Sequence, residues 1–146
     1  MKVISQNKQA TFLYHIIEKF DAGIVLIGQE VKSIKLGQIN LKGSYVVVKG
    51  NELYLVGCHI PPYQPKNIEN YSPDRPRKLL LKRKELNYLI GKSRQGGLTL
   101  IPLKVYTSKA LIKVEIGVAK GKKLVDKREG IKKREIDRNL KRSLKL

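Results

Sequence analysis

The chain has 146 residues, a length that suits one hydrophobic core followed by a tail. Lys and Arg number 31 against 12 Asp and Glu, which gives a formal net charge of +19 at pH 7 and indicates a polyanionic partner. The hydrophobic fraction of 41% excludes a wholly disordered chain. The longest apolar runs are about five residues, whereas a membrane span needs roughly twenty, so no membrane partner is expected.

Two further features indicate the compartment. Residues Met1 to Gln9 lack the apolar core of a secretory signal, and the lone Cys58 has no partner for an internal disulfide. A cytoplasmic location is therefore expected.

The first third of the chain predicts a strand over residues 23–29 and a helix over 30–36 that ends at Gly37. A less regular pattern indicates a helix over 11–19. A hairpin should follow, because two apolar segments, 45–48 and 53–56, flank a Gly-Asn pair that accepts the positive φ angles of a tight turn.

The second half begins with a long surface loop. Five of the six prolines lie between Ile60 and Pro76 and exclude regular structure there. Beyond the loop the pattern predicts a strand over 77–81, a helix over 82–90, and a second hairpin of strands 98–106 and 111–118. Pro102 should mark an edge or a bulge.

About six short antiparallel strands with inserted helices predict a mainly β fold, a small closed barrel of the OB type, although periodicity also allows a sandwich. The barrel should occupy residues 1–118. Residues 119–146 hold twelve Lys/Arg and four Asp/Glu, a net +8. This tail has an apolar repeat at Ile136, Leu140 and Leu144, so it is either a frayed terminus or a segment that becomes helical on a polyanion.

Patterns that would support catalysis are weak. Gly91-Lys92-Ser93 resembles the end of a phosphate-binding loop, but Leu86 stands where that loop requires glycine. Cys58 and the adjacent His59 should point to opposite faces of a strand, so a buried thiol is expected rather than a nucleophile and base pair. No metal site, cofactor or enzymatic activity is expected.

Basic residues interleaved with seven tyrosines indicate RNA binding, in which lysines contact phosphates and rings stack on bases. Tyr45, Tyr54 and Tyr106 alternate with apolar residues and should be core or half-buried, whereas Tyr63 and Tyr71 should be freer. The segment 75–78, with Arg77 and Lys78, should form a basic rim that contacts phosphates or merely guards the sheet edge.

Several blocks in order resemble the SsrA-binding protein family, also called small protein B. These blocks cover nearly the whole chain: Asn7-Lys8, Phe20 to Ile24, Gly28 to Ser33, Asn40 with Ser44-Tyr45-Val46, His59-Ile60, Arg75 to Leu81, Ala119 to Lys123 and Asp126 to Arg128. The resemblance implies a monomeric, ribosome-associated adaptor that binds the tRNA-like domain of transfer-messenger RNA. It implies delivery of this RNA to stalled ribosomes for trans-translation, the rescue and peptide-tagging process.

The resemblance also assigns site residues. It implies RNA contacts by side chains spread over the body: Asn7, Lys8, Phe12, Asp21, Leu80 and Lys113. It implies that the tail, disordered when free, enters the decoding centre and the empty mRNA channel of the small subunit and is helical there. The ribosome contacts would come from the hinge and the start of the tail: Gly121, Lys122, Lys123, Val125, Asp126, Lys127 and Arg128.

Some positions differ from the family pattern. Asp21 stands where Glu is usual, Phe12 where His is usual, Val125 where His or Tyr is usual, and Ile136 replaces a frequent Trp. Three other functions stay open on sequence alone: a generic OB-type protein that binds single-stranded RNA, a ribosomal protein and an RNA-processing enzyme.

Overall fold

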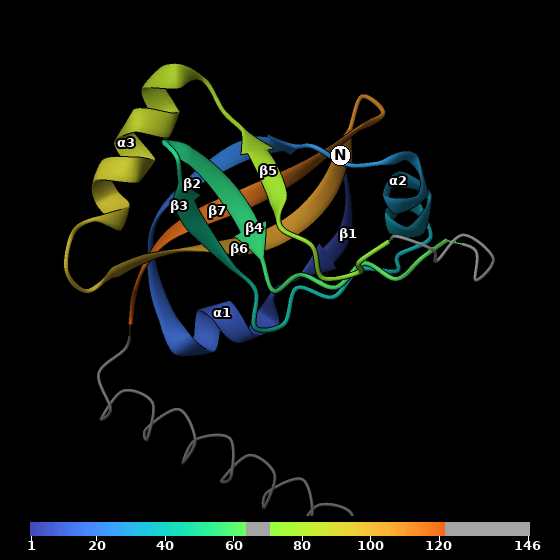
Figure 1. Cartoon of the computed structure of the whole chain (residues 1–146). Helices are drawn as coiled ribbons and strands as arrows, with labels where there is room; N and C mark the ends of the chain where they lie inside the picture. Colours follow the sequence, from blue (N-terminus) through green and yellow to red (C-terminus); the bar gives the residue numbers. More distant parts are fainter. Residues whose placement is uncertain (64–70, 122–146) are drawn as a thin grey trace, which may run out of the picture.

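Antiparallel strands and short helices make up the part of the chain that the computed structural model describes, residues 1–63 and 71–121 (Figure 1). The strands within these ranges are β1 (Lys2–Gln6), β2 (Tyr14–Ile24), β3 (Tyr45–Lys49), β4 (Glu52–Val56), β5 (Arg77–Leu80), β6 (Leu98–Ser108) and β7 (Leu111–Gly121). The helices are α1 (Lys8–Leu13), α2 (Gly28–Lys35) and α3 (Arg83–Ser93). None of these helices has the length and apolarity needed to cross a bilayer.

The strands close into a ring. Pairing runs from β6 through β3, β4, β5, β2 and β7 and returns to β6, so the expected closed antiparallel barrel with short helices is confirmed. Strand β6 pairs with three strands. One edge pairs with β7, and the other pairs with β3 at Leu100 in its first half and with β1 from Lys104 in its second half. Strand β1 was not predicted from the sequence.

The two hairpins have two-residue turns. Gly50 and Asn51 have φ values of 58° and 62°, which match the primed turn expected from the Gly-Asn pair. Lys109 and Ala110 make the second turn with φ values of 51° and 65°, and its strands extend further than the sequence indicated. The pairing of β6 with β7 shifts register between Pro102 and Lys104, so the expected irregularity at the proline is confirmed.

The start of the chain differs from the sequence prediction. The helix expected over 11–19 is wrong beyond Leu13, and the strand expected over 23–29 ends at Ile24 because α2 begins at Gly28. Residues 14–23 instead pair with β7, and these long-range backbone hydrogen bonds override the local helical pattern.

The interior of the barrel is apolar. Its buried side chains come from both helices and strands, including Ile34 of α2, Leu53 and Leu55 of β4, Leu89 of α3 and Ile116 of β7. The alternation expected over 111–118 is confirmed in β7, where Val114, Ile116 and Val118 are buried.

One ion pair lies inside this apolar surrounding. Glu30 of α2 and Arg77 of β5 both have 0% exposure, and Arg77 Nε donates to Glu30 Oε2 at 2.7 Å. The rest of the guanidinium donates to the carbonyls of Cys58 at 2.7 Å and Pro73 at 2.8 Å. Arg75 forms a second ion pair with Glu30. The prediction that Arg77 lies on an exposed basic rim is therefore wrong, because this guanidinium has no surface left for a phosphate.

The pKa of Glu30 reflects two opposing effects. Burial alone raises the pKa of this carboxyl, but hydrogen bonds from Arg75, the Ile27 amide and Arg77, with the positive charge of Arg77, hold it below the ordinary value of 4.5. The carboxylate is consequently ionised at neutral pH.

Glu30→Gln should lower the free energy of unfolding by about 3 kcal/mol at pH 7, because it leaves the buried Arg77 uncompensated. Glu30 has a lowered pKa in the folded state, so its contribution is present above pH 4.5 and is lost as the pH falls through the folded value. Urea unfolding measured between pH 7 and pH 3 should therefore show the difference from wild type shrinking with acidity. Glu85→Gln, at a partly exposed site in α3, is the control and should change stability by less than about 0.5 kcal/mol. An equal loss in both variants would contradict the prediction.

Candidate nucleic-acid interface

Three strands meet at Gly23 on the outer face of the barrel. Gly23 of β2 pairs with Leu80 of β5 on one side and with Lys113 of β7 on the other. Residues directly opposite in a sheet point to the same face, so Leu80 and Lys113 flank a position that has no side chain. Leu80 is 50% exposed and Lys113 is half-buried. Gly23 is half-buried between an apolar side chain and a cation, and Leu80 Cβ comes within 3.4 Å of the place where a Cβ of Gly23 would lie.

A carboxylate is fixed next to this position. Asp21 lies two residues before Gly23 on the same face of β2 and is exposed. The Tyr106 hydroxyl donates to Asp21 Oδ1 at 2.6 Å, and Tyr106 itself is only 6% exposed. Burial of the hydroxyl and its hydrogen bond to Asp21 raise the pKa of Tyr106 to about 12. The tyrosine therefore stays a donor at neutral pH, and Asp21 Oδ2 remains an acceptor for a hydroxyl or amino group.

A hollow of about 560 Å³ lies beside α1, and it is bordered by Glu115, which pairs with Asp21 across β2 and β7. Its floor includes Leu103, whose side chain packs 3.0 Å from the site where Gly117 would carry a Cβ. Three lysines from three elements border it: Lys8, Lys19 and Lys104. Lys104 makes an ion pair of 3.6 Å with Glu115, whereas Lys8 and Lys19 are exposed. Anionic ligands are favoured along this hollow.

Lys19 and Lys104 were not among the site residues expected from the sequence. Lys19 lies two residues before Asp21, so it shares a strand face with it, and this alternation was the signal available. The pairing that brings Lys104 of β6 close to them could not be read from the chain.

Asn7 holds the junction between β1 and α1. Its backbone N–H donates to the carbonyl of Leu103 at 2.8 Å, and its Nδ2 donates to the carbonyl of Pro102 at 2.9 Å. The side chain thereby anchors α1 to the irregular part of β6. Asn7 Oδ1 is the atom that remains for a ligand.

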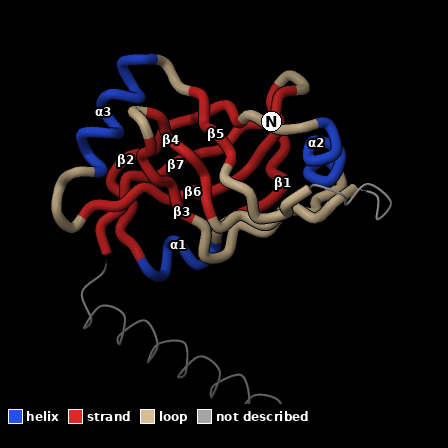
Figure 2. Tube along the Cα trace, in the orientation of Figure 1, coloured by secondary structure: helices blue, strands red, loops and turns tan. Residues whose placement is uncertain are grey.

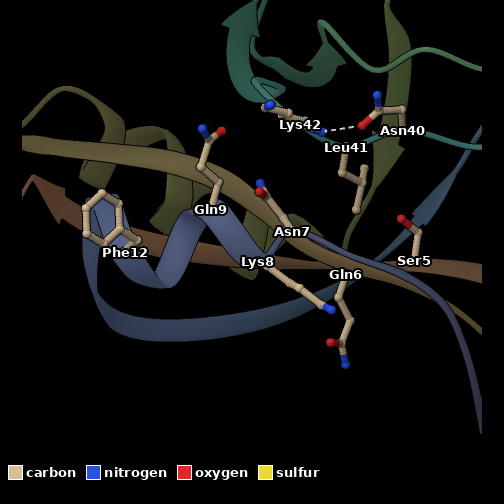
Figure 3. A pocket seen from close by; sticks show the side chains of 9 residues that line it. All are labelled: Ser5, Gln6, Asn7, Lys8, Gln9, Phe12, Asn40, Leu41 and Lys42. Carbon is tan, nitrogen blue, oxygen red and sulfur yellow. Dashed lines mark hydrogen bonds between the residues drawn. The ribbon is translucent and has the colours of Figure 1, made fainter. Parts of the chain in front are cut away.

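A second hollow, of about 470 Å³, lies on the other side of Asn7 (Figure 3). In this view the amides of Asn7 and Gln9 point toward the turn at residues 40–42, where Lys42 N–H donates to Asn40 Oδ1 at 2.9 Å. Phe12, on the same helix as Gln9, lies at the far end of the hollow. Amide, lysine and aromatic side chains are those that contact base edges, phosphates and base faces.

The remaining expected residues have different environments. Lys78 is half-buried and its Nζ lies 3.7 Å from Glu52 Oε1. Strand β7 continues past residue 118 to Gly121, which is exposed. Ala119, within this continuation, is buried. Residues 122–146, with Lys122, Lys123, Val125, Asp126, Lys127 and Arg128, lie outside the described residues.

The tyrosine predictions had mixed outcomes. Tyr106 is buried and Tyr54 is half-buried, as expected, but Tyr45 is 49% exposed, so its predicted burial is wrong. Tyr71 is half-buried and its hydroxyl donates to the carbonyl of Ile60 at 2.7 Å, so it is less free than expected.

The Cys58–His59 pair is arranged as expected. Cys58 is buried, and burial raises the pKa of its thiol to about 11, so it is a poor nucleophile. The imidazole of His59 is turned outward and its Nδ1 lies 2.9 Å from Asp74 Oδ1.

Comparisons with known proteins match the whole chain. The family model described as SmpB protein matches residues 4–146. The SsrA-binding protein of Gloeothece citriformis is 51% identical over 145 residues, which cover 99% of this chain and 94% of the relative. That of Carboxydothermus hydrogenoformans is 48% identical over 144 residues, 99% of this chain and 97% of the relative.

A solved structure is also similar. It is described as "tmRNA-SmpB: a journey to the center of the bacterial ribosome", has a TM-score of 0.72 and 42% sequence identity, and the match covers 90% of this chain and 95% of that one.

Proposed function

This chain belongs to the SmpB protein family, the SsrA-binding proteins, and from this premise we propose that it binds transfer-messenger RNA and delivers it to stalled ribosomes for trans-translation. The observation that carries the proposal is the likeness, over 90% of this chain, to the structure described as "tmRNA-SmpB: a journey to the center of the bacterial ribosome". The family consists of RNA-binding adaptors, so we assign recognition, and not catalysis, to this chain.

The outer face around Gly23 supports this function chemically. Lys113 and Lys19 supply cations for phosphates, and the exposed Leu80 supplies an apolar contact beside Gly23. A carboxylate on a surface that binds RNA repels phosphates, so Asp21 has to accept a hydrogen bond from a ribose hydroxyl or a base amino group. The hydrogen bond from Tyr106 holds it in place for that contact.

The body and the tail have separate roles in this proposal. Residues 122–146 carry eleven Lys/Arg and four Asp/Glu, and eleven minus four is a net charge of +7. We assign this segment to the decoding centre and the empty mRNA channel of the small subunit, with Gly121 as the hinge. The barrel up to Gly121 is assigned to the tRNA-like domain.

We expect the protein to prefer the tRNA-like domain over single-stranded RNA of equal length by about a hundredfold or more at roughly 150 mM salt, because counterion release alone favours neither strongly. Competitive binding measures this preference. Near-equal binding would leave only a generic RNA-binding barrel.

The same assay tests the Gly23 surface. Lys113→Ala should weaken binding of the tRNA-like domain about tenfold and reduce the salt slope by about one, with little change in melting temperature. Lys49→Ala, at an exposed site beside the β3–β4 turn, is the matched control. A large loss of stability in Lys113→Ala would instead make Lys113 a packing residue.

Tyr106→Phe should weaken this RNA binding about fivefold, the equivalent of roughly 1 kcal/mol, because Asp21 loses its donor. In an Asp21→Ala background, which has no oxygen to accept the Tyr106 hydroxyl, the same change should have no further effect, and a double-mutant cycle measures this coupling. Tyr88→Phe removes a similar bond of 2.6 Å to Glu18 and is the control. Additive losses would show that Tyr106 acts through packing.

Deleting residues 122–146, which leaves β7 intact, should keep affinity for the tRNA-like domain within about threefold at roughly 150 mM salt, since long-range charge is screened there. Peptide tagging on stalled ribosomes should be abolished. A reconstituted translation assay with truncated mRNA measures tagging. If binding and tagging fell together, the division between body and tail would be wrong.

A further inference from the structure

We propose that the segment His59–Tyr63 is a second RNA-binding site, on which an unpaired nucleotide stacks against ring side chains. The platform, as we call it, consists of His59, Pro61, Pro62 and Tyr63. The proposal rests on the RNA-binding function above and adds to it a site that lies away from Gly23.

The platform borders a hollow of about 640 Å³ whose walls are mainly apolar. Tyr63 is 37% exposed and the His59 side chain is 50% exposed. Figure 2 shows this loop region beside α2. The residues that line the hollow are Gln38, Ile39, Asn40, His59, Pro61, Pro62 and Tyr63.

The backbone beneath the platform is held from several directions. His59 and Asn40 exchange two hydrogen bonds of 3.1 and 2.9 Å, and Ser33 Oγ of α2 donates to the carbonyl of Pro61 at 2.7 Å. Ile60 is tied at both ends. Its N–H donates to the carbonyl of Pro73 at 3.0 Å, and its carbonyl accepts from the Tyr71 hydroxyl at 2.7 Å.

Three of the four rings of the platform are held in place. The bond between His59 Nδ1 and Asp74 Oδ1 fixes the imidazole and leaves Nε2 for a ligand. Pro61 and Pro62 have no free backbone N–H and a fixed φ. The His59, Pro61 and Pro62 rings therefore lose little conformational entropy on binding, and beside them the exposed Tyr63 ring suits a planar ligand.

The positive charge around the platform favours a planar ligand that also carries negative charge. Lys32 of α2 places Nζ 5.4 Å from the centroid of the Tyr63 ring, so a cation lies within reach of any group that stacks there. Lys35 and Lys42 are further exposed cations on the two segments that adjoin the platform, α2 and the 40–42 turn. The carboxylate of Asp74 is paired with His59. A ring that stacks and also carries negative charge is a nucleotide.

The platform is continuous with the surface already assigned to RNA. Asn40 lines both its hollow and the hollow beside Asn7 and Phe12 in Figure 3. An RNA segment held at α1 can therefore continue across the turn at residues 40–42 to Tyr63. The same chemistry is offered by unpaired nucleotides of transfer-messenger RNA and of ribosomal RNA.

Tyr88 provides a matched comparison within the chain. It is 40% exposed, and Lys92 Nζ lies 5.5 Å from its ring centroid, so its exposure and cation match those of Tyr63. Its ring, however, packs against Phe20 at 5.7 Å and its hydroxyl is bound to Glu18. Because the ring and the hydroxyl of Tyr88 are already engaged by Phe20 and Glu18, we expect no base to stack there.

The absence of tryptophan from the sequence makes stacking directly measurable. Tyr63→Trp in the full chain introduces a single indole, whose fluorescence should be quenched on titration with a single-stranded oligoribonucleotide of about eight nucleotides. Tyr88→Trp is the control and should not be quenched. Titration with the isolated tRNA-like domain and with small ribosomal subunits, in separate arms, shows which RNA supplies the nucleotide.

Affinity gives an independent readout. Tyr63→Ala should weaken binding of the RNA that quenches Tyr63→Trp by about tenfold, since a base stacked on an aromatic ring contributes about that much. Tyr88→Ala should not. Circular dichroism and melting temperature establish that both variants are folded.

Quenching of Tyr63→Trp alone, with loss of affinity in Tyr63→Ala, supports the platform. No quenching by any of the three RNAs, or quenching only by a proline-rich peptide used as a comparison ligand, overturns it. If these results contradict the platform while Lys113→Ala still weakens binding of the tRNA-like domain, the proposed function stands without the platform. If neither substitution changes binding, the proposed function is wrong as well.

Discussion

Glu30 and Arg77 are both removed from solvent, and the cost of burying two charges is offset only when every hydrogen bond between and around them is made. Their partners come from α2, the residues after β4 and the loop before β5. The pair thereby fixes three segments that have no regular backbone pairing with one another. Because an incomplete set would leave a buried charge uncompensated, the network tolerates little displacement of any of these segments.

Both surfaces assigned to RNA depend on this network. In β5 the side chains alternate, so an inward Arg77 and Leu79 direct Leu80 outward, beside Gly23. The same guanidinium binds the carbonyl of Cys58, which precedes the platform at His59. One buried pair therefore connects a strand at one surface with a loop at the other.

Irregular pairing places the remaining side chains. Register shifts occur in β1 between Val3 and Ser5, in β2 between Ile16 and Glu18, and in β6 between Pro102 and Lys104. Each inserts a residue into one strand and increases its local bend, which helps a small sheet to close. The shift in β6 also leaves Leu103 above Gly117 and gives Asn7 its carbonyl partners. Lysines from separate strands consequently border one hollow.

The sequence by itself determined the composition of the molecule: its excess of positive charge, a mainly β body, the turn at Gly50-Asn51 and the buried alternation of β7. These are local properties, since charge, turn geometry and period-two alternation are read within a few residues. Only the tertiary structure decided that residues 14–19 form a strand, that Arg77 is buried with Glu30, and that Tyr106 binds Asp21 across 85 residues of chain. Each of these features depends on residues that are distant in sequence. Pairing with such residues overrides the local propensity for helix or strand, and it decides whether a charged side chain is buried or exposed.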